Sequence, residues 1–182
     1  MTPEEHLRAA LAAVACGIPE GMIDTPARVV KAWRDMTRGY GEDPASILSR
    51  TFDADGYDQI VCLRGVAFQS LCEHHLLPFT GTVDLAYLPG ARVVGLSKLA
   101  RLVDCFARRF QIQERMTKQI ADAVEQHLSA RGVLVVVRGT HSCMTCRGVL
   151  KPGAEMVTSD VRGLLREVPA ARGEALALLR AD

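Results

Sequence analysis

Hydrophobic and polar positions divide the chain into helical and strand-like regions. Apolar residues recur at three- and four-residue spacing in residues 97–106 and at four-residue spacing from Ile112 to Leu128, which predicts two amphipathic helices. Nearer the start, residues 4–16 and 25–36 predict two further helices, each ending shortly before a glycine. We therefore expect a helical N-terminus and a second pair of helices beyond the middle of the chain.

Short runs rich in β-branched residues predict strands on both sides of the second helical pair. These runs cover residues 60–68, 82–88, 92–96 and 133–137. A sheet, two helices and a return to the sheet is an α+β arrangement.

These patterns divide the chain into three segments. Residues 1–41 are expected to form an N-terminal helical segment, residues 42–59 a linker with at most one short helical turn, and residues 60–182 the main α+β domain. Within the last segment, one or two short helices are expected, beginning at Val161 and at Arg172.

Composition and charge narrow the classes of partner. The 182 residues are 48% hydrophobic and carry a formal net charge of +1, so bulk charge favours neither nucleic acid nor a membrane surface. The N-terminus is acidic and lacks the apolar run of a secretory signal, and the longest aliphatic run, residues 133–137, is too short to span a bilayer. We expect a cytoplasmic protein, in which six cysteines indicate metal binding or catalysis rather than a disulfide framework.

Two short clusters collect most of the cysteine and histidine residues. Their sequences are Cys72-Glu73-His74-His75 and His141-Ser142-Cys143-Met144-Thr145-Cys146-Arg147. Thiolate and imidazole groups two residues apart are typical zinc ligands. By spacing alone, a closed structural site with four ligands and an open site with three ligands and water are about equally favoured.

The residues beside the clusters favour the open site. A closed structural site needs no further titratable groups, yet His74 precedes His75 directly and His141 lies two residues before Cys143. On a strand, positions 141 and 143 point to the same face, which places an imidazole beside the metal. A lone histidine is usually structural, but two of them flanking one metal site indicate general acid–base catalysis.

Two further stretches have the chemistry to bind a nucleotide. Lys98 and Arg101 lie on one face of the first turn of a predicted helix, where free N–H groups already favour an anion such as phosphate. Gln113 and Glu114 offer donors and acceptors that could read the edge of a guanine-like ring. Taken singly, each stretch is better explained as an ordinary solvated helix start.

Four motifs in order resemble the GTP cyclohydrolase I family from about Thr25 to the end of the chain. They are Cys72-Glu73-His74-His75-Leu76-Leu77-Pro78-Phe79, Gly95-Leu96-Ser97-Lys98-Leu99-Ala100-Arg101, Gln111-Ile112-Gln113-Glu114-Arg115-Met116-Thr117-Lys118-Gln119-Ile120, and Thr140-His141-Ser142-Cys143-Met144 with Arg147-Gly148-Val149. The resemblance implies a tunnelling fold (T-fold), with helices packed on one face of an antiparallel sheet, assembled as a homodecamer. It also implies zinc-assisted opening of the guanine ring of GTP, loss of formate and closure to 7,8-dihydroneopterin triphosphate, the entry reaction of folate and tetrahydrobiopterin synthesis.

The resemblance assigns the metal-binding and catalytic residues individually. Cys72, His75 and Cys143 correspond to the zinc ligands, so the implied site is open. His141 corresponds to the residue that exchanges protons with the imidazole nitrogens, and His74 to one that assists the later ribose steps.

The same resemblance assigns the substrate contacts. Gln113 and Glu114 correspond to the pair that reads guanine. The implied triphosphate contacts are Ser97, Lys98, Arg101, Arg147 and, from a neighbouring subunit, Arg28. A local cluster of cations can hold a polyanion although the whole chain is nearly neutral.

One departure from the family pattern bears on the metal site. Cys146 occupies a position where the family usually has an apolar, non-ligating residue, so it is either a bystander thiol near the site or a competitor for the metal. Two other functions therefore stay open, a non-catalytic module with a closed structural zinc and a T-fold relative acting on another purine nucleotide.

Overall fold

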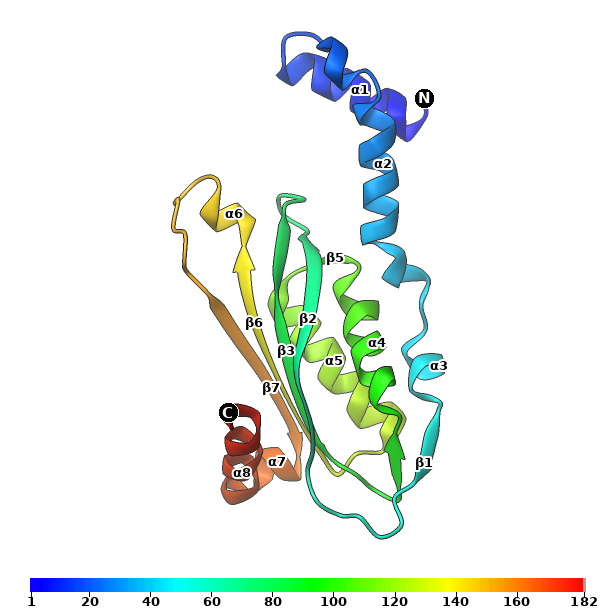
Figure 1. The fold of residues 1–182 in the computed structure, drawn as a ribbon, viewed down its shortest axis with the longest axis vertical. Coiled ribbons are helices and arrows are strands. Elements are labelled where there is room, and N and C mark those ends of the chain that lie inside the picture. Colours follow the sequence, from blue (N-terminus) through cyan, green and yellow to red (C-terminus); the bar gives the residue numbers. More distant parts are fainter. Residues whose placement is uncertain (182) are drawn as a thin grey trace.

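The structure, a computed structural model that describes residues 1–181, is built on a five-stranded sheet with strand order β5-β2-β3-β6-β7 (Figure 1). The strands are β2 (Val61–Cys72), β3 (Pro78–Leu88), β5 (Phe110–Gln111), β6 (Gly132–His141) and β7 (Met156–Gly163). Neighbouring strands are antiparallel except β5, which runs parallel to β2. The sheet, together with its helices, confirms the expected α+β class.

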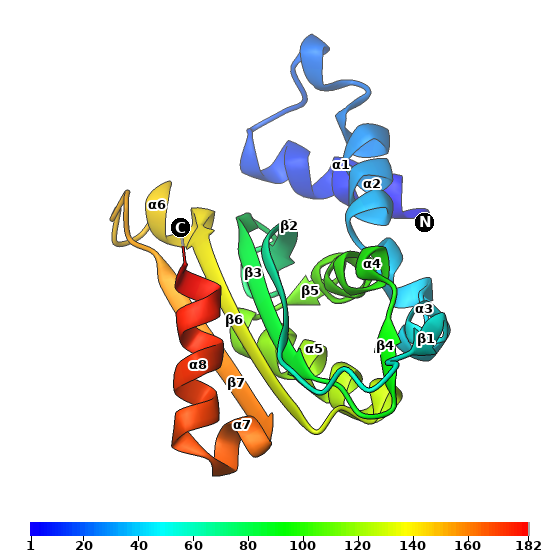
Figure 2. The same ribbon diagram turned by 60° about the horizontal axis from the view of Figure 1, so that its bottom comes forward.

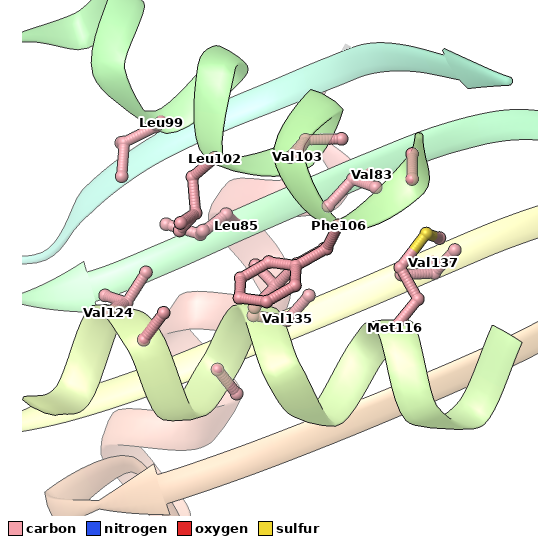
Figure 3. Close-up of a cluster of buried hydrophobic side chains, with 14 of the residues drawn as sticks. Val83, Leu85, Leu99, Leu102, Val103, Phe106, Met116, Val124, Val135 and Val137 are labelled. Atoms are coloured by element: carbon pink, nitrogen blue, oxygen red, sulfur yellow. The ribbon is translucent and has the colours of Figure 1, made fainter. Parts of the chain in front are cut away.

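Two helices, α4 (Leu96–Ala107) and α5 (Gln113–Leu128), cover one face of this sheet. Their apolar faces meet alternate residues of β3 and β6 in the main core, because side chains two apart on a strand share a face (Figure 3). The labelled core residues are Val83, Leu85, Leu99, Leu102, Val103, Phe106, Met116, Val124, Val135 and Val137. Within residues 1–181, none of the helices has the length and hydropathy of a membrane-spanning segment.

The opposite face of the sheet is covered in part by the C-terminal helices. These are α7 (Leu164–Glu167) and α8 (Pro169–Arg180), and α8 lies on the far side of the sheet from α4 and α5 (Figure 2). A second, smaller core forms there, in which Leu165, Ala175 and Leu179 pack against alternate residues of β6. The sequence places helices on one face only, so this second layer is an addition to the expected arrangement.

The N-terminal helices stand away from the sheet at one end of the molecule (Figure 1). They are α1 (Pro3–Val14) and α2 (Thr25–Met36), joined by the 3-10 turn η1 (Glu20–Met22). A second 3-10 turn, η2 (Arg38–Gly41), attaches them to the body, because the N–H of Gly39 donates to the carbonyl of Arg108 at 3.0 Å. A Cβ at position 39 would lie 2.2 Å from the Cys105 carbonyl oxygen, so only glycine allows this close approach.

Residues 42–59, expected to be a linker with at most a short helical turn, contain more structure than that. Asp43 caps the short helix α3 (Pro44–Leu48), whose Leu48 is buried in the main core. Strand β1 (Thr51–Asp53) then pairs with β4 (Arg92–Val94) in a small separate sheet. This segment is therefore packed against the body rather than only connecting two parts.

The expected helix at Val161 is also wrong, because residues 156–163 form strand β7 at the edge of the sheet. The helical turn α7 begins only at Leu164, directly after Gly163 with a φ of 52°. Pairing with β6 determines the conformation of this segment, and that pairing is not visible in its local sequence.

Replacing Leu102 with alanine is expected to destabilise the protein by about 3 kcal/mol, because a fully buried leucine loses its contacts and leaves a cavity. The change in thermal or urea unfolding measures this effect. Leu96→Ala on the same helix is the matched control, since Leu96 is 63% exposed. Equal destabilisation by the two variants would contradict the assigned core.

Candidate metal centre and its surroundings

The three residues Cys72, His75 and Cys143 meet at one end of the sheet. Cys72 ends β2, His75 lies in the turn to β3, and Cys143 lies in the short helix α6 (Ser142–Thr145) that follows β6. Their ligand atoms all lie within 4.8 Å of one another, and Cys72 Sγ is 3.7 Å from His75 Nδ1. Because β2 and β6 both flank β3, two stretches far apart in the sequence are brought to the same point.

A tight turn returns His75 toward Cys72. The N–H of Leu76 donates to the Cys72 carbonyl at 2.8 Å, and the N–H of Cys72 donates to the Leu77 carbonyl at 2.9 Å. Leu76 has a φ of 53°, a left-handed conformation that is rare for leucine. The surrounding hydrogen bonds hold this costly conformation, which keeps the imidazole beside the thiol.

The donor set of this cluster fits a zinc ion. Two thiols and one imidazole are ligands that zinc prefers, and three protein ligands leave a coordination position open. Burial, together with the neighbouring Cys72 thiol, raises the pKa of Cys143. A divalent cation would offset this effect by replacing the thiol protons.

Cys146, the candidate for a fourth ligand, lies outside the group. It is exposed, and its N–H donates to the Ser142 carbonyl at 3.0 Å at the end of α6. Among residues 1–181, the cluster that could hold a metal contains three residues and not this cysteine. The geometry thus favours the open site over the closed one.

His141 lies beside the cluster at the end of β6. Its ring stacks on Phe79 with the centroids 4.6 Å apart and the planes 6° apart, and its Nε2 is 3.0 Å from Gln113 Oε1. Burial lowers the pKa of His141, while the charge of Glu114 opposes that effect. The neutral imidazole is therefore the main form near pH 7, and it can accept a proton.

His141 and the two thiols line a cavity of about 200 Å³, which His74 and Glu114 also line. His74 is exposed, with its Nε2 3.8 Å from a carboxylate oxygen of Glu73. Glu114 is exposed in the first turn of α5. The cavity is thus lined by two candidate metal ligands, two histidines and one carboxylate.

A bidentate ion pair between Glu73 and Arg115 was not predicted from the sequence. The two contacts measure 2.5 and 2.9 Å, and the Arg115 hydrogen bonds lower the pKa of Glu73. The pair fastens the turn that carries His75 to the start of α5, next to Glu114. In the sequence, Glu73 and Arg115 stand in two separate motifs and carry opposite charges. Their spacing gives no reason to pair them.

Gln113 is placed differently from its neighbour Glu114. Its side chain is fully buried, and its amide nitrogen lies 3.0 to 3.1 Å from three acceptors within the chain. The expected pair of ring-reading side chains therefore has only one exposed member.

The expected phosphate-binding residues are not brought together in one chain. Arg147 lies at the metal cluster, with its guanidinium 3.2 Å from His75 Nε2. Lys98 and Arg101 lie in the first half of α4, at the end that follows β4. The last turn of α4 leads instead to β5, which pairs with β2 at Cys72 (Figure 2). With a rise of about 1.5 Å per residue, Lys98 lies about 14 Å along the helix from its end.

Two other predicted phosphate contacts also lie away from the thiols. Ser97 is exposed beside Lys98, and Arg28 on α2 pairs with Asp24 at 3.2 Å. None of the residues Ser97, Lys98, Arg101 and Arg28 lines the cavity at the thiols. In a single chain, the first half of α4 with Lys98 and Arg101 is therefore separated from the thiol cluster.

Comparisons with known proteins agree over most of the chain. Residues 4–180 match the family described as GTP cyclohydrolase I. Over 160 residues the chain is 51% identical to a protein named GTP cyclohydrolase 1 from Rhodopirellula baltica, covering 88% of this chain and 69% of that one. A protein of the same name from Wolinella succinogenes is 50% identical over 161 residues, covering 88% and 86%.

A solved structure shares the architecture at low sequence identity. The archaeosine synthase QueF-Like in its apo form superposes with a TM-score of 0.50 at 18% identity, covering 59% of this chain and 96% of that one. This likeness concerns the fold alone, and it supports the tunnelling fold expected above.

Proposed function

Because the chain belongs to the GTP cyclohydrolase I family, we propose that it hydrolyses GTP to 7,8-dihydroneopterin triphosphate and formate. This reaction is the first step of pterin and folate synthesis. The observation that carries the proposal is the cluster of Cys72, His75 and Cys143, whose two thiols line one cavity with His141. We place the enzyme in the cytoplasm, where thiols stay reduced.

Zinc is the proposed cofactor, held by Cys72, His75 and Cys143. When bound, the ion lowers the pKa of water and polarises oxygen atoms, which assists hydrolysis near neutral pH. The position of Cys146 outside the cluster supports an open site. The protein supplies soft ligands in a partly buried pocket that holds them close together.

His141 is the proposed residue for proton exchange at the guanine imidazole nitrogens. Its neutral ring takes a proton as water adds at C8 and returns it as the carbon–nitrogen bond breaks. Stacking on Phe79 restricts the ring to one plane. His74, which is exposed and lines the same cavity, is proposed to assist the later ribose steps.

Glu114 is the proposed reader of guanine, because its exposed carboxylate can accept hydrogen bonds from N1–H and the exocyclic amine. Gln113, the other residue that the resemblance assigns to this edge, lines the same cavity. Its buried position, with the amide nitrogen at three acceptors of the chain, gives it a different kind of role.

The triphosphate is proposed to bind Ser97 and four cationic residues, which are Lys98, Arg101, Arg147 and, from a neighbouring subunit, Arg28. Only Arg147 lies at the metal cluster of its own chain. Since Lys98 and Arg101 lie toward the far end of α4, a second copy would have to present them to the cavity. This separation supports active sites at subunit interfaces, for which we propose a homodecamer.

Two inactive variants are expected to restore activity to each other when co-expressed. Lys98→Ala removes a phosphate contact and Cys143→Ser removes a metal ligand, so a mixed assembly contains some sites that have both groups intact. The measurement is GTP turnover of co-expressed variants against each variant alone. Co-expression of Lys98→Ala with Arg101→Ala is the control, because both variants damage the same half of the site. Failure of the first pair to recover turnover would contradict the shared site.

Incubation of the zinc-loaded protein with GTP tests the function directly. The expected products are formate and a pterin that fluoresces after oxidation. A correctly assembled, zinc-loaded protein that yields neither would overturn the proposal. The mass of the product separates this reaction from that of a relative acting on another purine nucleotide or stopping at a ring-opened formamide.

A further inference from the structure

The side chain of Gln113 is fully buried at the start of α5, where it borders the cavity that the two thiols and His141 line. Its Oε1 is 3.0 Å from His141 Nε2. Its Nε2 is 3.1 Å from the Val137 carbonyl, 3.0 Å from the Met156 carbonyl and 3.1 Å from Thr158 Oγ1. The amide therefore joins α5 to β6, β7 and the catalytic histidine.

The two ends of this amide are not interchangeable. The nitrogen faces two carbonyl oxygens, which only accept hydrogen bonds, so the amide oxygen could not occupy that position. The oxygen must then face His141, and an amide oxygen only accepts. His141 Nε2 is consequently the donor in this contact, which leaves Nδ1 as the ring nitrogen that Gln113 does not engage.

Two threonines extend the arrangement. Thr117 Oγ1 donates its hydrogen to the backbone carbonyl of Gln113 at 2.7 Å. The hydroxyl of Thr158 lies 2.7 Å from Thr117 Oγ1 and is therefore the donor in that contact. Thr158 Oγ1 is then free to accept from the Gln113 amide. The two amide hydrogens of Gln113 thus face three acceptors and no donor, which holds the amide in one orientation.

Gly139 on β6 provides the space for this amide. A Cβ at position 139 would lie 2.5 Å from Gln113 Oε1, well inside any real contact distance. The amide of Gln113 can therefore occupy this position against β6 because residue 139 is a glycine.

We infer that Gln113 is a positioning residue, which accepts a hydrogen bond from His141 Nε2 and holds the imidazole against Phe79 with Nδ1 left for the substrate. The inference rests on the proposed function and refines it. A side chain that reads guanine needs a polar atom that is free to face the substrate, whereas the amide nitrogen of Gln113 is engaged within the chain and its oxygen faces His141. Gln113 therefore acts on the reaction through His141.

Gln113→Met keeps the approximate length and volume of the side chain but removes the oxygen that accepts from His141. We expect kcat to fall about 10- to 100-fold, because a small displacement of a catalytic group is costly, while KM for GTP changes by less than about threefold. Gln119→Met is the matched control on the same helix, since Gln119 makes a side-chain hydrogen bond to Gln111 and none to His141. A rise in KM with kcat unchanged would overturn the inference.

Equilibrium binding removes catalysis from the comparison. In a His141→Ala background, which is not expected to turn over, calorimetry with GTP is expected to give affinities within about threefold with and without Gln113→Met. A loss of about tenfold or more would identify Gln113 as a substrate contact and overturn the inference.

A crystal structure of Gln113→Met gives a readout that needs no activity. The His141 ring is expected to leave the parallel stack on Phe79, and an unchanged ring would overturn the positioning role. If the unmodified enzyme makes no pterin from GTP, the proposed function is wrong. The orientation of the His141 ring in Gln113→Met still tests the positioning role, because it does not depend on activity.

Discussion

Cys143→Ser is expected to abolish GTP turnover and to lower zinc affinity by at least about 100-fold, because even an outer-shell partner contributes up to that much and a direct ligand contributes more. Serine has a similar size but a hydroxyl that stays protonated, so it cannot replace the thiolate. Zinc content after dialysis against a chelator, measured beside turnover, gives both quantities.

Cys146→Ser is the matched control, since it removes a thiol three residues along the chain and outside the cluster. It is expected to retain zinc and full turnover. If Cys146→Ser lost zinc as readily as Cys143→Ser, the site would have four ligands, and the closed structural alternative would replace the open one.

His141→Ala is expected to lower kcat by about 10²- to 10⁴-fold, the range that a positioned acid or base contributes, while zinc content stays the same. The reason is that His141 lines the cavity without belonging to the ligand set. Turnover and zinc content of the same preparation are the measurements. His127→Ala, an exposed histidine on α5, is the control. Undiminished turnover in His141→Ala would refute its catalytic role even with zinc present.

The helices α4 and α5 were predicted from sequence because their apolar faces meet the sheet along their whole length, and such burial leaves a clear period. Strand β7 was not, because residues 156–163 adopt their conformation from pairing with β6. Strand β1 was missed for the same reason, since its partner β4 lies far along the chain. Sequence patterns thus identify elements with a continuous buried face, and they miss strands that depend on pairing with a distant segment.

The candidate ligands were predicted from their spacing and from the family resemblance. Spacing could not decide between three and four ligands, because the outcome depends on how α6 places Cys146. The burial of Gln113 was equally hidden. A glutamine beside a glutamate at a helix start resembles a solvated pair, and only the absence of a side chain at Gly139 makes room for it on the sheet.

The separation of Lys98 and Arg101 from the thiol cluster has a consequence for when a newly synthesised chain becomes active. If neighbouring copies complete each other's sites, a chain that has no neighbour is inactive even when its own metal ligands are in place. The chain then becomes active when it associates with other copies, so activity depends on the concentration of this protein. Folding and the onset of catalysis become separate steps in time, and the supply of product responds more steeply than linearly to the amount of protein made.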